Sequence, residues 1–138
     1  MIGVQFILYV RDQARSTAFY AAVLAQPPDL DVPGMTQFRL GDGAILGLMP
    51  AAGIKRLLGD PLPDPAQAAG IPRAELYLLV PDPLAYHQRA LAHGAVELSS
   101  LQERDWGDRA AYSLDPDGHV LAFAQAIESA GQHQPVVE

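Results

Sequence analysis

The chain has 138 residues and a formal net charge of −7, and it contains no cysteine and only four histidines. That length suits one domain or two small modules, and the lack of cysteine excludes disulfides, thiolate metal sites and a cysteine nucleophile. Because an acidic chain repels phosphate backbones, we expect no nucleic-acid partner. The apolar N-terminal run is too short to span a membrane and has no positive flank, so we expect no membrane partner and a cytoplasmic location.

The first third of the chain predicts one strand, one helix and three further strands. The run Gly3–Val10 is short, apolar and rich in β-branched residues, which favours a buried strand. Asp12 occupies the N-cap position of an amphipathic helix, and Pro27 and Pro28 end that helix. Gly41-Asp42-Gly43 predicts a tight hairpin between the last two strands. The three predicted strands cover residues 28–32, 35–40 and 44–49.

The second half of the chain repeats this order of elements. A strand is predicted at 74–80, and Asp82 and Gly94 mark the start and the end of a helix. Asp115-Pro116-Asp117-Gly118 has the composition of a turn between two later strands. The predicted strands after the helix cover 96–101, 109–114 and 120–124, and a short helical stretch is predicted at 54–58.

This repeat predicts an α+β fold in which two βαβββ modules form one cupped mixed β-sheet with helices on its convex face. A single four-stranded module leaves a sheet face uncovered, so two modules are expected to share a core. The expected organisation is a first module at 1–50, a connecting segment at 51–72, a second module at 73–125 and a C-terminal tail at 126–138.

Three motifs resemble those of the vicinal oxygen chelate superfamily, the group of glyoxalase I, extradiol dioxygenases, and fosfomycin and bleomycin resistance proteins. They are the strand end Val10-Arg11-Asp12, the Phe19-Tyr20 pair before Val23-Leu24, and Asp115-Pro116-Asp117-Gly118-His119 before the last strand. The resemblance covers about residues 2–125. It implies paired βαβββ modules, often assembled as a homodimer.

The resemblance also marks four positions where metal-binding relatives place their ligands, one on the first and one on the last strand of each module. In this chain those positions hold Gln5, Gly47, Glu75 and Ala122. Glycine and alanine offer no side-chain donor, and two oxygen ligands do not hold a catalytic Zn²⁺ or Ni²⁺ or build the two-His, one-carboxylate iron site. We therefore expect no metal and no other cofactor.

The polar and aromatic residues of the repeat suggest a ligand site on the concave face. Gln5 and Glu75 are expected to face one cavity, and a desolvated Glu75 would be a candidate general base. Trp106 lies on a loop that would wall the cavity, with Arg109 presenting its guanidinium to an anion or a ring. The candidate ligand-binding residues are Gln5, Phe38, Glu75, Tyr77, Trp106, Arg109 and Tyr112. His87 and His93 are expected at solvated positions of the second helix.

The leading functional hypothesis implied by the resemblance is a homodimer that binds a small apolar or aromatic molecule without a metal, as a resistance or sequestration protein does. The acidic composition suits a cationic ligand. Two alternatives stay open. One is a metal-dependent lyase, isomerase or dioxygenase that recruits its metal through Gln5 and Glu75, and the other is a metal-free enzyme that uses Glu75 as its base.

Overall fold

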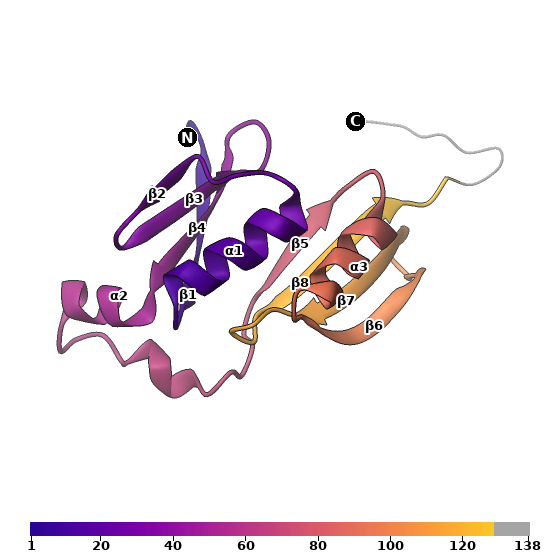
Figure 1. Cartoon of the computed structure of the whole chain (residues 1–138). Helices are drawn as coiled ribbons and strands as arrows, with labels where there is room; N and C mark the ends of the chain where they lie inside the picture. Colours follow the sequence, from indigo (N-terminus) through magenta and orange to yellow (C-terminus); the bar gives the residue numbers. More distant parts are fainter. Residues whose placement is uncertain (129–138) are drawn as a thin grey trace.

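The computed structural model describes residues 1–128, so residues 129–138 of the expected tail lie outside the described part. The two expected βαβββ modules are confirmed (Figure 1). The first comprises β1 (Val4–Val10), α1 (Gln13–Leu24), β2 (Leu30–Val32), β3 (Met35–Arg39) and β4 (Ala44–Pro50), and the second comprises β5 (Glu75–Leu79), α3 (Pro83–Ala92), β6 (Val96–Glu103), β7 (Asp108–Leu114) and β8 (Val120–Ala126). Between them lie α2 (Ala51–Leu58) and the 3₁₀ helix η1 (Pro65–Ala68).

Both module helices begin at the aspartates that the sequence marks. The Asp12 carboxylate accepts a hydrogen bond from the backbone N–H of Arg15 at 3.1 Å, and Asp82 accepts one from Ala85 at 3.3 Å. Each aspartate thereby satisfies a backbone donor that the first helical turn leaves unpaired. Among residues 1–128, none of the helices is long and apolar enough to cross a membrane.

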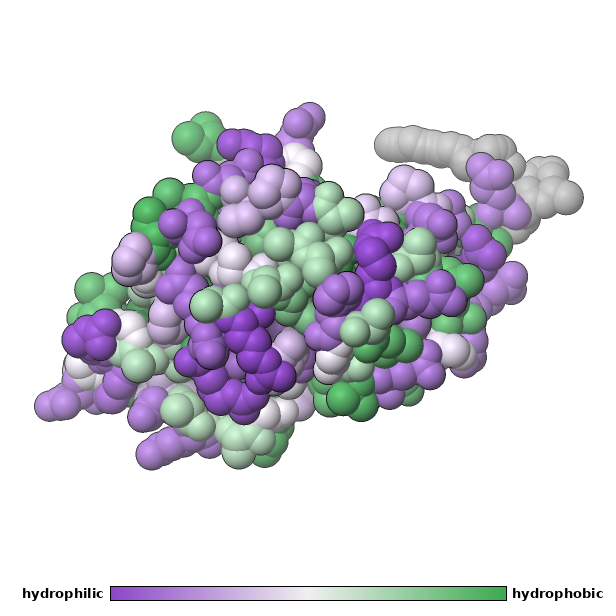
Figure 2. Space-filling view, in the orientation of Figure 1, coloured by the Kyte–Doolittle hydropathy of each residue, from purple (hydrophilic) through white to green (hydrophobic). Residues whose placement is uncertain are grey.

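Each module builds its own four-stranded mixed sheet. The strand orders are β1-β4-β3-β2 and β5-β8-β7-β6, so the first and last strands of each module pair in parallel and the other pairs are antiparallel. Helices α1 and α3 lie side by side on one face of the two sheets (Figure 1), and Arg89 on α3 donates a hydrogen bond to the carbonyl of Val23 on α1. The helix-bearing side is a mosaic of hydrophilic and hydrophobic residues (Figure 2).

The core lies between these helices and the sheet faces that they cover. Because side chains alternate across a strand, Leu46 and Leu48 on β4 point to the helices and are fully buried. Leu121 and Phe123 occupy the matching places on β8 and are also fully buried. The residues between them face the opposite side, which we call the strand face of each module.

A hydrogen-bond network joins the first module to the second at the β7–β8 turn. Tyr20 on α1 donates to the Asp115 carboxylate at 2.6 Å, and Ser16 on α1 donates to Asp117 at 2.8 Å. The other Asp117 oxygen accepts from the backbone N–H of Arg11 at 2.9 Å. Tyr20, Ser16 and Asp115 are all buried. The Phe19-Tyr20 and Asp115–His119 motifs therefore meet in space, and their shared role is to hold the modules together.

The free energy of unfolding is expected to fall at alkaline pH because of Tyr20. Burial raises the pKa of Tyr20 well above its ordinary value of 10.0, and the Asp115 carboxylate raises it further. The folded state therefore holds the phenol proton more tightly than the unfolded chain does. This stabilisation is complete below pH about 10 and is lost as the pH rises towards the folded-state pKa. Urea unfolding between pH 8 and pH 11 measures it.

The Tyr20→Phe variant provides the control. It lacks the titrating group, so its stability should decline less steeply above pH 10, while at neutral pH it should already be less stable by about 1–2 kcal/mol because Asp115 loses a donor. If the free energy of unfolding fell equally with pH in the two proteins, Tyr20 would not be the group responsible for the decline.

Two buried serines offer a matched pair for measuring hydrogen-bond energetics. The Ser16 hydroxyl has Asp117 as its partner, whereas the Ser113 hydroxyl has no hydrogen-bond partner among residues 1–128. Ser16→Ala is expected to destabilise the protein by about 1–3 kcal/mol, because a buried carboxylate loses a donor. Ser113→Ala removes an unsatisfied group, so it should be neutral or stabilising by up to about 1 kcal/mol. Chemical denaturation measures both changes. If the two variants lost the same free energy of unfolding, the Ser113 hydroxyl would have a hydrogen-bond partner in solution.

Candidate functional site

The strand register places the repeat residues in equivalent positions of the two modules. Ile7 pairs with Gly47 in the first module, and Tyr77 pairs with Ala122 in the second. Gln5 and Glu75 stand two residues earlier on their strands, so each lies diagonally across from Gly47 or Ala122 on the same strand face. The four positions marked by the sequence resemblance therefore lie as two neighbouring pairs, one in each module.

The side chains at these positions do not suit a metal. A Cβ atom at Gly47 would lie 2.7 Å from the Gln5 side-chain nitrogen, so the Gln5 amide lies across the space that a larger residue at 47 would fill. Ala122 is buried between two tyrosine-bearing strands and brings no donor. Within residues 1–128, no group of three or more His, Cys, Asp or Glu side chains lies close enough to hold a metal ion. These residues therefore do not offer the donor set of the metal centre that the sequence resemblance implies.

The strand face of the second module carries a polar and aromatic cluster. Tyr77, Ala122 and Tyr112 form one row across β5, β8 and β7. The Tyr77 hydroxyl donates to the Asp108 carboxylate at 2.6 Å and accepts a hydrogen bond from the Trp106 indole N–H at 2.9 Å. Trp106 is 59% exposed, so its ring is available to a ligand. We call Tyr77, Trp106 and Tyr112 the aromatic cluster.

The surroundings of the aromatic cluster are charged. Burial raises the pKa of Tyr112, and the Glu75 carboxylate raises it further. Burial and the Asp108 hydrogen bond likewise raise the pKa of Tyr77, so both phenols stay protonated and can donate hydrogen bonds at neutral pH. The Arg104 guanidinium lies 5.2 Å from the centre of the Tyr112 ring. Its nitrogens donate to the Ser99 hydroxyl and to backbone carbonyls, including that of Ala110. These hydrogen bonds hold the guanidinium beside the Tyr112 ring.

Gln5 and Glu75, expected to face one cavity, belong to different sheets. Gln5 lies on β1 in the first module and Glu75 begins β5 in the second, and none of the contacts described within residues 1–128 joins the two. Both side chains are exposed. The expectation of a desolvated carboxylate at Glu75 was therefore wrong, because the residue lies at the open start of its strand, and burial gives no argument for a general base there.

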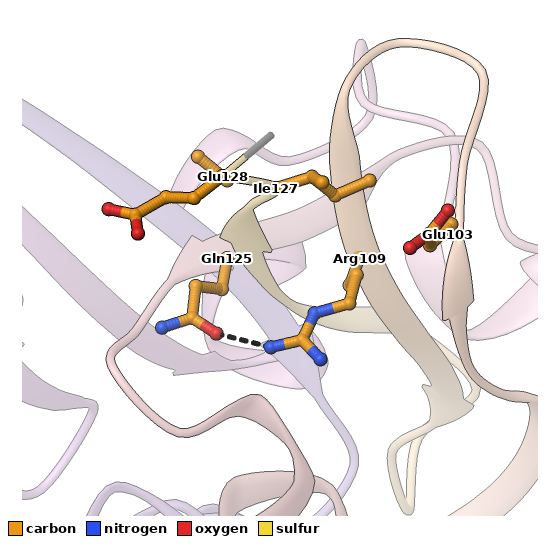
Figure 3. Close-up of a pocket in the computed structure, with 6 residues that line it drawn as sticks. Glu103, Arg109, Gln125, Ile127 and Glu128 are labelled. Carbon is orange, nitrogen blue, oxygen red and sulfur yellow. Dashed lines mark hydrogen bonds between the residues drawn. The ribbon is translucent and has the colours of Figure 1, made fainter. Parts of the chain in front are cut away.

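Two further candidates lie away from the strand face. Phe38 is fully buried on the helix-covered side of β3, so the expectation that it contacts a ligand was wrong. Arg109 lies on the opposite face of β7 from Tyr112, three residues away, because side chains alternate. It donates to Gln125 at 2.8 Å and borders a separate hollow of about 600 Å³ with Glu103 and Glu128 (Figure 3). The expected partnership of Arg109 with Trp106 is thus not formed.

The two histidines at α3, both expected at solvated positions, differ in burial. His93 is exposed as expected, but His87 is only 2% exposed, and its Nε2 atom lies 2.8 Å from a Glu97 carboxylate oxygen. Asp108 and Arg104 were missed as parts of the site. The only sequence signal for them was their proximity to Trp106 in the loop between β6 and β7.

Comparisons with known proteins agree with this fold. The profile of the glyoxalase-like domain matches residues 5–124. An uncharacterized protein of Mycobacterium bovis is 30% identical over 129 residues, which cover 87% of this chain and 80% of that protein. A glyoxalase-related enzyme from Fulvimarina pelagi superposes with a TM-score of 0.74 at 20% identity, covering 88% of this chain and 86% of that one.

A second solved structure is a glyoxalase/bleomycin resistance protein/dioxygenase family enzyme from Burkholderia phytofirmans. It superposes with a TM-score of 0.73 at 19% identity, covering 89% of this chain and 97% of that one. At these identities the two structures show a shared fold only, whereas the family profile spans both modules. This chain therefore belongs to the glyoxalase-like domain family.

Proposed function

We propose that this chain binds a small aromatic molecule on the strand face of its second module, without a metal, and acts by sequestering it. The observation that carries the proposal is the exposed Trp106 ring hydrogen-bonded to Tyr77 beside Tyr112. Aromatic walls with a few directed polar groups are typical of small-molecule sites. The neighbouring carboxylates of Glu75 and Asp108 favour a ligand with a positive charge, because cations are also attracted to aromatic ring faces.

The residues at the family's metal positions support the metal-free form of the proposal. Gln5 and Glu75 together supply two oxygen donors, and Gly47 and Ala122 supply none. Three or more donors are usual at a catalytic metal centre. Elemental analysis of protein purified without chelator tests this point. Zinc, nickel, iron or manganese at one ion per chain, lost in Gln5→Ala or Glu75→Ala, would overturn it in favour of a metal-dependent enzyme.

We also propose that the protein acts as a homodimer. β1 and β5 are edge strands of their sheets, and Phe6 and Leu79 on them are more than half exposed. Edge strands with exposed apolar side chains tend to be covered by another chain. Light scattering after gel filtration should give a dimer mass, and Leu79→Lys should shift the equilibrium towards monomer. A wild-type monomer mass at all concentrations would contradict this part.

Binding of an aromatic cation tests the ligand proposal directly. The probe is 9-aminoacridine, compared with anilinonaphthalene sulfonate, an aromatic anion, and binding is measured by calorimetry. We expect saturable binding of the cation and weaker binding of the anion. Tyr112→Ala and Trp106→Leu should each weaken cation binding by about tenfold or more, because anchoring aromatic residues contribute over about 1 kcal/mol.

Arg109→Ala is the matched control, since it changes the same strand on the opposite face and should leave the affinity unchanged. Equal loss in Arg109→Ala and Tyr112→Ala, or no preference for the cation, would contradict the proposed site.

A further inference from the structure

A second cavity lies where the first module, the connecting segment and the second module meet, away from the aromatic cluster. It has a volume of about 510 Å³ and lies between the C-terminal half of β1, the β7–β8 turn and residues 65–74. We call residues 65–74, which contain η1 and lead into β5, the strap. The strap passes below the end of β1 in Figure 1. A cavity of this volume falls within the range that holds drug-sized molecules.

The walls of this cavity are held in place by short-range contacts. The Asp64 carboxylate accepts from the backbone N–H of Ala66 at 3.0 Å and so caps η1. A Cβ atom at Gly118 would lie 3.0 Å from the Gly70 carbonyl oxygen, so the strap approaches the β7–β8 turn as closely as glycine permits. The His119 ring Nε2 lies 3.0 Å from the Tyr9 carbonyl oxygen, which joins the turn to β1. The cavity is therefore formed before any ligand arrives.

The cavity combines apolar walls with positive charge. Ile7, Tyr9 and Ile71 line it, and each is at least 39% exposed, so their apolar surface is open to an occupant. Arg11 and Arg73 also line it, and the single acidic residue in the lining is Asp117. Both Asp117 oxygens already accept hydrogen bonds from residues of the first module. The Arg11 Nε atom lies 3.6 Å from an Asp117 oxygen, so the net positive charge of the lining comes from Arg73.

We propose that the strap cavity binds an amphipathic carboxylate, a molecule with one carboxylate on an aryl or short alkyl body. Burial of the body against Ile7, Tyr9 and Ile71 removes exposed apolar surface from water. The carboxylate pairs with Arg73 and lies in the field of Arg11, whose Nη2 already donates to the Pro116 carbonyl at 2.7 Å. Arginine suits this role because its planar fork matches a carboxylate. This site is separate from the aromatic cluster and does not depend on the ligand binding proposed there.

Calorimetric titration with three matched probes tests the proposal: 4-phenylbutyrate, 4-phenylbutanol and 4-phenylbutylamine. We expect phenylbutyrate to bind at one molecule per chain and at least about tenfold more tightly than the alcohol or the amine. Arg73→Ala should weaken phenylbutyrate by about tenfold or more, and Arg73→Glu should reverse the preference in favour of the amine. Arg56→Ala, an exposed arginine of α2 outside the cavity lining, should change nothing.

Three results would overturn the proposal. The first is equal affinity for the three probes, and the second is unchanged phenylbutyrate binding in both Arg73 variants. The third is binding that weakens as self-association increases, which would make the cavity part of an interface between copies. Tyr112→Ala should still bind phenylbutyrate, which separates this site from the aromatic cluster. If the aromatic cluster binds no ligand, only the 9-aminoacridine measurement would change.

Discussion

Asp115→Ala is expected to lower the free energy of unfolding by about 3–5 kcal/mol. The Asp115 carboxylate is 4% exposed and accepts three hydrogen bonds, from the Tyr20 hydroxyl at 2.6 Å and from the backbone N–H groups of Asp117 and His119 at 2.9 Å. Removing the acceptor leaves the buried Tyr20 hydroxyl and two partly buried backbone N–H groups unpaired. The loss should exceed that of Tyr20→Phe, because two of the three bonds also shape the turn.

Urea denaturation followed by circular dichroism measures this loss, with Asp60→Ala as the control. Asp60 is exposed in the connecting segment, so its replacement should cost less than about 0.5 kcal/mol. Because the network links α1 to the β7–β8 turn, hydrogen exchange in Asp115→Ala should rise in both segments. A loss below about 1 kcal/mol would show that the modules are held together chiefly by apolar packing between α1 and α3.

Phe38→Ala is expected to destabilise the protein by about 3–5 kcal/mol and to leave the chemistry of the strand face unchanged. Phe38 is fully buried in the cluster that includes Phe19, Tyr20 and Val23, so truncation opens a cavity that its neighbours fill only in part. The measured quantity is again the free energy of unfolding. Phe38→Leu, which keeps most of the volume, should cost about 1–2 kcal/mol.

Leu57→Ala is the control because Leu57, on α2, is a large apolar side chain that is 69% exposed. Its replacement should cost less than about 1 kcal/mol in the monomeric chain. In the still folded Phe38→Leu variant, 9-aminoacridine should bind as it does to wild type. If Phe38→Leu lost ligand binding with little loss of stability, Phe38 would contact the ligand, which would contradict its burial in the core.

The order of elements could be predicted from the sequence because the signals for it are local. An N-cap aspartate acts within one helical turn, and a Pro–Asp–Gly turn acts within four residues. Asp12, Asp82 and the turn at Asp115–Gly118 therefore appeared where expected. The repeat of strand, helix and three strands followed from the same signals, and with it the family.

The face that each strand residue takes could not be predicted so directly. A shift of one residue in register moves every side chain to the other face. In β7, alternation separates Arg109 from Tyr112, but the adjacent Ala110 and Ala111 fit either environment, so the sequence did not show which face the helices cover. In β3 the polar Thr36 shares the core face with Phe38 because its hydroxyl is paired with that of Thr17 on α1, so polarity does not mark which face of β3 is buried.

By itself, then, the sequence determined two βαβββ modules with their caps and turns, since these depend on residue type and short spacing. Only the tertiary structure decided which residues meet. It brought Tyr20 to Asp115 across 95 positions of the chain and Trp106 to Tyr77 across 29, and it formed the strap cavity from four separate stretches of the chain. Such contacts depend on strand register and on the docking of the two modules, which no local pattern encodes.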